Sequence, residues 1–485
     1  MKQIVGLAIA LIAFACVGLP GQEVEHSSRF THSSGEVFDL APSDQLNDFL
    51  GSSARLSTGD LIEIALIFSG VSQEHRVGYR SQILNLIADS KMSVEADSSP
   101  YEKGEAILAF LHASVFGRYD ESQTYLDVLL DSGLYNCVSS SVLYAIFARE
   151  YGLELHGTIT KDHAFCTLVI DDESIDVETT TPAGFDPGRK TEFFDSFGNL
   201  TGYSYVPPSN YRDRTKADER ELFALILHNR ISLLDAQERF RESLSLSIDR
   251  HAFLQTESTF QNIVREIGNL VAVLNRERRY DDALGLLDLV YREYGVLSEL
   301  QRTHHGILNN LIVEQLRSNA FEAARVVLRS QTDTRVLPEE TLSGLRKMVV
   351  QNELAAKLPA LGISDGFALI TSIRNEASLP DDVYREYELS LYARSAEETA
   401  EADGYLAAAA VIDVAIESLG PDSRLVRARE VYRYNFAASE HNRFAEYFNA
   451  GKLEEARQIV VDALEFTPDS TLLAEDLATV ERILE

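Results

Sequence analysis

Apolar residues recur at helical spacing over the first patterned stretch of the chain, from about Ser43 to Phe116. In the segment DLIEIALIFSG four apolar residues fall on one face, and Gly70 ends the pattern. The segment YEKGEAILAFLHASVFG has apolar residues around most of its circumference, which is typical of a largely buried helix. This part of the chain is therefore predicted to be helical.

The period of the pattern changes after residue 151. Residues 137–151 keep helical spacing, and Gly152 is suited to end the helix. The segments LELHGTIT, HAFCTLVI and SIDVETT then alternate with a period of two, and a tight turn at 171–173 joins the last two. A helix followed by antiparallel strands predicts an α+β domain.

Strand signals vanish from about Lys216 onward, and the chain becomes similar to itself. Two segments share the same offsets, five residues from Gly to Ala and twelve from Ala to Pro: Gly404, Ala409 and Pro421, and Gly451, Ala456 and Pro468. Weaker copies surround Ala283 and Ala323. The pattern resembles tetratricopeptide repeats, in which a small Ala lets two helices pack closely. This predicts an all-α array of helical repeats, which presents a groove to a protein partner.

The length of the chain indicates its number of domains, and its charge limits the classes of binding partner. A chain of 485 residues exceeds one core, so several domains are expected. The formal net charge of −32 repels phosphate backbones, which excludes nucleic acid as a partner. The predicted segments are a signal peptide at 1–21, a polar linker at 22–42, the α+β domain at 43–212 and the helical repeats at 213–485.

The N-terminus predicts export. An unbroken apolar run of 14 residues extends from Ile4 to Val17, too short for a membrane span and typical of a signal peptide. The expected location is the periplasm or the cell surface of a bacterium. Alanines at 13 and 15 suit cleavage before Cys16, and a cut nearer Gly21 is an alternative. Attachment of a lipid anchor at Cys16 is a further alternative, although the preceding residues match a lipobox poorly.

The chemistry of the chain depends on Cys137, at the start of a predicted helix. A free thiol has a pKa near ~8.5, and a dominant thiolate at pH 7 requires about two units less, roughly 2.7 kcal/mol. A helix N-terminus supplies about 0.3–1 kcal/mol, and ~2 at best. In Cys–His enzymes a neighbouring imidazolium supplies the remaining stabilisation of the thiolate. The candidate here is His163, which is the first residue of the predicted strand HAFCTLVI. Cys166 faces away from His163 and is predicted to be a core residue. The alternative for Cys137 is a small buried hydrophobe.

An acid is expected to orient the imidazole, and the third strand offers Asp176 and Glu178. If the turn centres on Asp172, His163 lies opposite residue 181. Glu178 is then about 10 Å away along the strand and Asp176 about 17 Å. Register favours Glu178 and residue type favours Asp176, and either needs a bulge or bend to reach the imidazole.

These residues resemble the transglutaminase-like superfamily of papain-fold cysteine enzymes. The family pattern is Cys at a helix start, His-Ala-Trp on a strand and Asp-Pro-Thr on the next. This chain has GLYNC ending at Cys137, HAF beginning at His163 and DVETT at 176–180. The resemblance covers about residues 100–190. It implies a papain-like α+β fold, Cys137 as nucleophile, His163 as base and a carboxylate as third member.

The resemblance also bears on the acid and the oxyanion donors. Glu178 takes the place of the family's Asp when Thr180 is aligned with the family's Thr. The Cys137 N–H is one expected donor to the oxyanion, and Gln123 and Tyr135 are candidates for a side-chain donor.

Two functions follow from these observations. The favoured one is an exported thiol-dependent acyl-transfer enzyme, a peptidase, amidase or transglutaminase, acting on a peptide or amide. The alternative is a non-catalytic scaffold that binds proteins through the helical repeats and carries an inactive transglutaminase-like domain. No Gly-rich phosphate loop and no zinc spacing is present, so no cofactor is expected, and the adjacent His304 and His305 are interpreted as surface residues.

Overall fold

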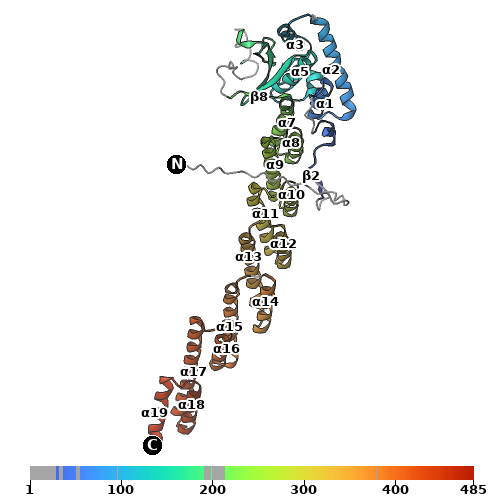
Figure 1. The fold of residues 1–485 in the computed structure, drawn as a ribbon. Coiled ribbons are helices and arrows are strands. Elements are labelled where there is room, and N and C mark those ends of the chain that lie inside the picture. Colours follow the sequence, from blue (N-terminus) through green and yellow to red (C-terminus); the bar gives the residue numbers. More distant parts are fainter. Residues whose placement is uncertain are drawn as a thin grey trace, which may run out of the picture. The chain divides into compact units, whose positions relative to one another are not determined.

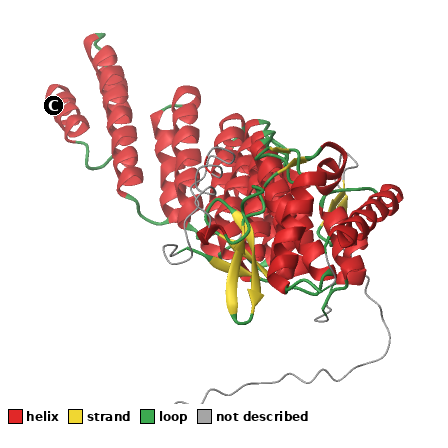
Figure 2. Cartoon of the chain, turned by 90° about the horizontal axis from the view of Figure 1, so that it is seen from above, coloured by secondary structure: helices red, strands yellow, loops and turns green. Residues whose placement is uncertain are grey.

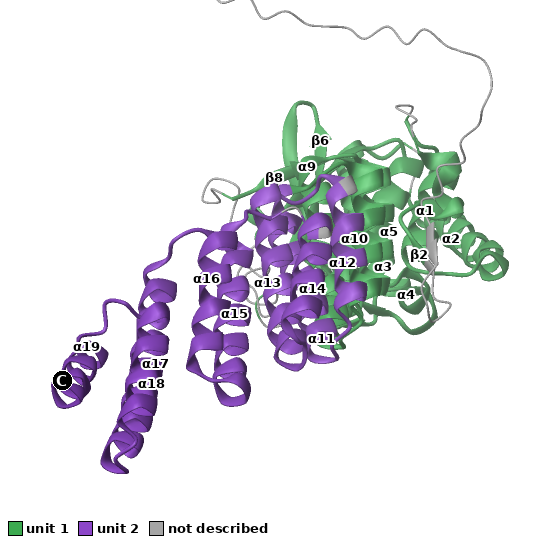
Figure 3. Ribbon diagram, turned by 90° about the horizontal axis from the view of Figure 1, so that it is seen from below, with its two compact units in different colours: residues 1–297 green, residues 298–485 purple. Residues whose placement is uncertain are grey.

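The computed structural model describes residues 29–31, 37–50, 55–94, 97–189, 198, 213–377 and 379–485. The chain divides into two compact units, Met1–Leu297 and Ser298–Glu485 (Figure 3). Helices form most of the described chain, and the strands are short (Figure 2). The predicted signal peptide and Cys16 lie outside the described residues. No helix among those that are described combines the length and apolar character needed to cross a bilayer.

Unit 1 combines helices with a small antiparallel sheet (Figure 1). Its helices are α1 (Thr58–Phe68), α2 (Gln73–Ser93), α3 (Pro100–Ser114), α4 (Leu126–Ser132), α5 (Cys137–Glu150), α7 (Glu219–Ala236), α8 (Phe240–Leu254), α9 (Glu257–Arg276) and α10 (Tyr280–Tyr294), with 3-10 turns η1 (Asp44–Phe49) and η2 (Pro187–Arg189). Its strands are β1 (Arg29–Thr31), β2 (Val37–Asp39), β3 (Arg118–Tyr119), β4 (Leu134–Tyr135), β5 (Glu154–Ile159), β6 (Ala164–Ile170), β7 (Glu173–Val177) and β8 (Thr215–Ala217).

The main sheet has the strand order β7-β6-β5-β8, with all neighbours antiparallel. A two-residue turn at Asp171 and Asp172, with φ of 50° and 66°, joins β6 to β7. The three predicted strands and their hairpin are confirmed. Strand β8 was not predicted, because three residues flanked by polar sequence carry no recognisable alternation.

The core of unit 1 surrounds α5. Residues 138–148 of this helix are all buried, and α5 packs against α1, α3 and α7 and against β5 and β6. Three consecutive serines, at 139–141, lie inside this core and are all hydrogen-bonded. A helix buried on every side holds its first residue at a fixed place relative to the sheet.

Two boundaries differ from those predicted. Unit 1 continues past residue 212 to Leu297, because α7 packs on α5 and β5, α8 on α7, and α9 on α8. The interval 22–42, predicted as a polar linker, contains the paired strands β1 and β2. Phe38 and Leu40 are buried there and tie the segment to unit 1.

Unit 2 is an array of helices in which each helix packs mainly on its neighbours in sequence. The array comprises α11 (Ser298–Arg317), α12 (Phe321–Thr334), α13 (Glu339–Lys357), η4 (Leu358–Ala360), α14 (Ile363–Ala377), α15 (Asp382–Asp403), α16 (Tyr405–Leu419), α17 (Ser423–Asn449), α18 (Leu453–Phe466) and α19 (Thr471–Leu484). The prediction for His304 was wrong: the residue is fully buried, and its Nε2 lies 2.8 Å from Gln331 Oε1.

One turn geometry recurs between helices of both units. A residue of positive φ precedes the first residue of the next helix by two positions at Glu238, Arg278, Asn319 and Gly451, with φ between 56° and 75°. Gly404, matched to Gly451 by sequence, has φ 91° and ψ 172° and so makes a different turn. The repeat is therefore a repeat of backbone conformation more than of residue type.

Candidate active site

Cys137 is the first residue of α5 and is half-buried. Asn136 caps the helix: its Oδ1 accepts hydrogen bonds from the N–H groups of Val138 (3.0 Å) and Ser139 (2.9 Å). In the reverse direction, the Ser139 hydroxyl accepts a hydrogen bond from the Asn136 N–H at 3.0 Å. The Cys137 N–H has no acceptor within the helix at this position, so it is available to a ligand at the sulfur.

His163 lies just before β6, in a turn closed by the Thr160 N–H donating to the His163 carbonyl at 2.8 Å. Its Nε2 is 2.6 Å from Glu178 Oε2, and the two side chains are 8% and 0% exposed. Burial alone lowers the pKa of His163. The negative charge of Glu178 and hydrogen bonds with Cys137 and Glu178 outweigh it and raise the pKa to about 10. Because Glu178 occupies Nε2, the interaction of the imidazole with the Cys137 thiol falls to Nδ1.

Glu178 reaches the imidazole because the chain leaves the sheet. Ladder pairing ends at Cys166 opposite Val177, and the next residue turns so that its N–H donates to the Gly184 carbonyl at 2.8 Å. A Cβ on Gly184 would lie 1.9 Å from the Glu178 carbonyl oxygen, so only glycine fits there. The Thr180 N–H and hydroxyl both donate to Glu178 Oε1, at 3.2 and 2.7 Å.

Asp176 is not part of this group. Its Oδ1 accepts from Arg214 Nη2 at 2.6 Å and from the Thr167 hydroxyl at 3.2 Å. The Arg214 guanidinium in turn stacks on Phe165 at 4.7 Å. Of the two predicted acids, Glu178 therefore contacts His163, and Asp176 is held in an ion pair.

The segment carrying the acid is fixed from three elements. The Thr179 hydroxyl bonds with those of Ser140 (2.8 Å) and Ser141 (3.0 Å) on α5. His112 Nε2 on α3 donates to the Thr179 carbonyl at 3.1 Å, and the Tyr135 hydroxyl donates to the Thr180 carbonyl at 3.0 Å. These bonds tie the acid and the helix of Cys137 into one rigid group.

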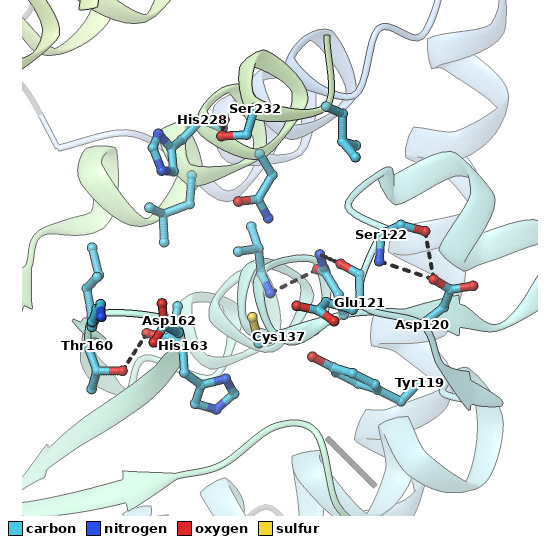
Figure 4. A pocket seen from close by; sticks show the side chains of 18 of the residues that line it. Tyr119, Asp120, Glu121, Ser122, Cys137, Thr160, Asp162, His163, His228 and Ser232 are labelled. Carbon is cyan, nitrogen blue, oxygen red and sulfur yellow. Dashed lines mark hydrogen bonds between the residues drawn. The ribbon is translucent and has the colours of Figure 1, made fainter. Parts of the chain in front are cut away.

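The predicted side-chain donors for the oxyanion are engaged elsewhere. Tyr135 makes the bond just described, and the Gln123 amide donates to the Tyr125 carbonyl at 2.9 Å. Tyr119 instead lines the pocket and points its hydroxyl toward Cys137 (Figure 4). No motif indicated Tyr119, since the parallel pairing of β3 with β4 places it beside the site.

A pocket of about 720 Å³ opens at Cys137 and His163. One wall comes from the loop at 119–122 and from residues 159–164, and the other from α7 and α8 (Figure 4). The second wall, which consists of Leu225, His228, Asn229, Ser232, Leu233 and Arg250, lies in the part of the chain predicted as repeats.

Cys166 is a core residue, as predicted. It is fully buried, its thiol donates to the Ser141 carbonyl at 3.4 Å, and burial raises its pKa. The described residues contain no group of three or more His, Cys, Asp or Glu side chains arranged to hold a metal.

Comparison with protein-family models, with curated proteins and with solved structures finds no match. The chemistry of the site therefore has to follow from its own geometry.

Proposed function

We propose that the protein is a thiol-dependent acyl-transfer enzyme acting on a peptide or amide, and that unit 1 is a transglutaminase-like domain. The observation that carries this proposal is the buried His163–Glu178 pair beside Cys137, at the mouth of a pocket. A structural cysteine needs no charged, buried imidazole next to it. The predicted signal peptide would direct this activity outside the cytoplasm.

In the first half of the reaction the sulfur attacks the acyl carbon. Protonated His163 beside the sulfur favours the thiolate over the thiol, as does the N-terminus of α5. As the S–C bond forms, the carbonyl oxygen becomes an oxyanion. The Cys137 N–H and the Tyr119 hydroxyl are the proposed donors to it.

Collapse of this intermediate breaks the C–N bond. His163 Nδ1 gives its proton to the departing amine, which leaves an acyl group on the Cys137 sulfur. Neutral His163 then takes a proton from an attacking water or amine, and the C–S bond breaks to release acid or a new amide. Throughout, Glu178 holds the imidazole by Nε2 and stabilises its charge. Hydrolysis is the default outcome, because water needs no dedicated acceptor site.

The rate of alkylation of Cys137 by iodoacetamide against pH tests the proposal. We expect a rate in the wild type that stays high below pH ~7, and that follows an ordinary thiol, near pH ~8.5, in His163→Ala. Mass spectrometry of the Cys137 peptide separates it from Cys166. An ordinary thiol profile in both proteins, or no reaction of the folded wild type, would overturn the enzyme assignment.

A second candidate function, protein binding by a tetratricopeptide-like array, is favoured by a pocket of about 510 Å³ in unit 2. Helices α17 and α18 line it with Phe436, Tyr447, Ile459 and Phe466, and Phe466 remains 52% exposed. Peptide-display selection on the full chain and on Phe466→Ser tests this role. Enrichment of the same sequences on both proteins would argue against it.

A further inference from the structure

The wall of the pocket formed by α7 and α8 carries positive charge in a strongly acidic protein. Arg250 on α8 and His228 on α7 both line the pocket, and Figure 4 shows His228 across the pocket from Cys137. Burial, followed by the charges of Arg250 and Arg265, lowers the pKa of His228 to about 4. His228 is therefore neutral at neutral pH, and Arg250 carries the charge of this wall.

Arg250 lacks a counter-charge among the described residues. Its Nε is buried and has no hydrogen-bond acceptor there, and the charged group acting on it is another cation, Arg265. Three acids of these helices face other groups: Asp249 accepts from the Ser43 N–H at 2.7 Å, Glu266 pairs with Arg265 at 2.8 Å, and Asp235 Oδ2 lies 3.8 Å from Arg265 while its Oδ1 is buried without a hydrogen-bond partner in the described part of the chain.

A partly buried guanidinium without an anion is costly, and burial accordingly lowers its pKa. Arginines elsewhere in the chain show the usual solution, as Arg214 does with Asp176. The planar donor fork of a guanidinium fits a carboxylate with two parallel hydrogen bonds. A cation kept unpaired inside a pocket is thus suited to bind an anion supplied by the ligand.

The other charged residues that line the pocket favour one orientation of an anionic ligand. The wall opposite α7 and α8 carries three acids, Asp120, Glu121 and Asp162, and two cations, Lys161 and protonated His163. No acid is among the described residues that line the α7–α8 wall, so Arg250 attracts an anionic group there without the opposing acids of the other wall. A pocket of about 720 Å³ holds a few residues of a peptide, so an acyl carbon at Cys137 and an anion at Arg250 can belong to one ligand.

We propose that Arg250 is an anion-binding residue of this pocket, and that the substrate carries a carboxylate close to the acyl group that Cys137 attacks. The substrate part of this inference rests on the proposed function. The carboxylate is either an acidic side chain or a free C-terminus.

The first test measures the charge of the pocket with Cys137 as the probe. Alkylation rates with anionic iodoacetate and neutral iodoacetamide are compared in the wild type, Arg250→Gln and Arg250→Lys. The control is Arg276→Gln, which removes an exposed arginine paired with Glu238 outside the pocket. We expect the iodoacetate-to-iodoacetamide ratio to fall about three- to tenfold in Arg250→Gln alone. An unchanged ratio in that variant would overturn the proposal.

The second test does not depend on a reactive thiol. Binding of three acetylated peptides to full-length Cys137→Ala is measured by titration calorimetry: trialanine with a free carboxylate, its C-terminal amide, and an amidated peptide with a central glutamate. We expect one acidic peptide to bind at least tenfold more tightly than the amide, and Arg250→Gln to abolish the difference. The peptide that gains identifies the source of the carboxylate.

Equal binding of all three peptides with Arg250 present would refute the anion site. If the peptides are discriminated but alkylation shows an ordinary thiol, the anion site stands and the proposed enzyme function fails.

Discussion

The charge of Glu178 is expected to determine the protonation of His163, and Glu178→Gln isolates this effect. At the observed 2.6 Å and an effective dielectric constant near 20, the pair interacts by about 6 kcal/mol. A rise in the pKa of His163 from 6.5 to about 10 corresponds to roughly 5 kcal/mol, which is of the same order. Glutamine keeps the shape and the bonds from Thr180 but has no charge. Burial then dominates, and the pKa of His163 is expected to fall below 6.5.

The substitution also reverses the proton on the ring. A glutamine NH₂ facing Nε2 requires that nitrogen to accept, so the remaining proton of neutral His163 sits on Nδ1, facing the thiol. The thiol can then no longer give its proton to His163. We expect alkylation of Cys137 at pH ~6 to slow at least tenfold.

An NMR titration of the His163 ring reads the effect directly. The imidazolium signal should persist to about pH 10 in the wild type and disappear by pH 7 in Glu178→Gln. Asp176→Asn is the matched control: it removes a charge two residues away that is bound to Arg214. An unchanged His163 titration in Glu178→Gln would refute the reasoning.

Stability offers an independent check with a defined sign. Because the folded pKa of His163 lies above its unfolded value, its contribution is present below pH 6.5 and is lost as the pH rises through 10. Thermal unfolding should therefore show a smaller loss of stability over this interval in Glu178→Gln.

Other features give predictions of different kinds. Burial lowers the pKa of His112 to about 4, so the unfolded chain binds more protons than the folded chain between pH 6.5 and 4. The free energy of unfolding therefore decreases by up to about 1.4 kcal/mol for each unit that the pH is lowered over this interval. Urea unfolding should show a smaller decrease in His112→Gln than in the wild type, and the wild-type decrease in the control His75→Gln, whose side chain is exposed. Glu238→Gly should raise the free energy of unfolding by about 1 kcal/mol because it relieves a φ of 56°, and Gly451→Ala should lower it by about 1–2 kcal/mol. Thermal unfolding of the full chain measures both changes. A less stable Glu238→Gly or a more stable Gly451→Ala would contradict the assignment of strain to these turns. Gly184→Ala should release the acid-bearing bend and lower the His163 pKa seen by NMR; a wild-type titration would show that the bend does not need this glycine.

The parts of the fold set by local pattern could be predicted from the sequence. Helix α5 and the hairpin of β6 and β7 follow from a change of hydrophobic period and from a turn rich in Asp. Register favoured Glu178 over Asp176, and Glu178 is the acid that contacts His163. Register alone left Glu178 about 10 Å from the imidazole, because the contact depends on a bend after Val177. That bend is made by contacts of Glu178 with Thr180 and Gly184, which no alternation records.

Contacts distant in sequence set the rest of the site. Tyr119 reaches it through a two-residue parallel pairing, and Arg250 through the packing of α8 on α7. Neither position has a distinguishing neighbour in the sequence. The burial of His304 was missed for a similar reason, since its partner Gln331 lies on the next helix.

The pocket wall formed by α7 and α8 affects where this chain can be divided into modules. A fragment ending at residue 212 would contain Cys137, His163 and Glu178 but lack β8 and the helices that supply Leu225, His228 and Arg250. These three side chains would then be open to solvent on one side. Helix α7 thus serves both as a wall of the pocket and as the first helix of the all-helical stretch. Replacing that stretch would change which ligands reach the Cys137 thiol while leaving Cys137, His163 and Glu178 in place.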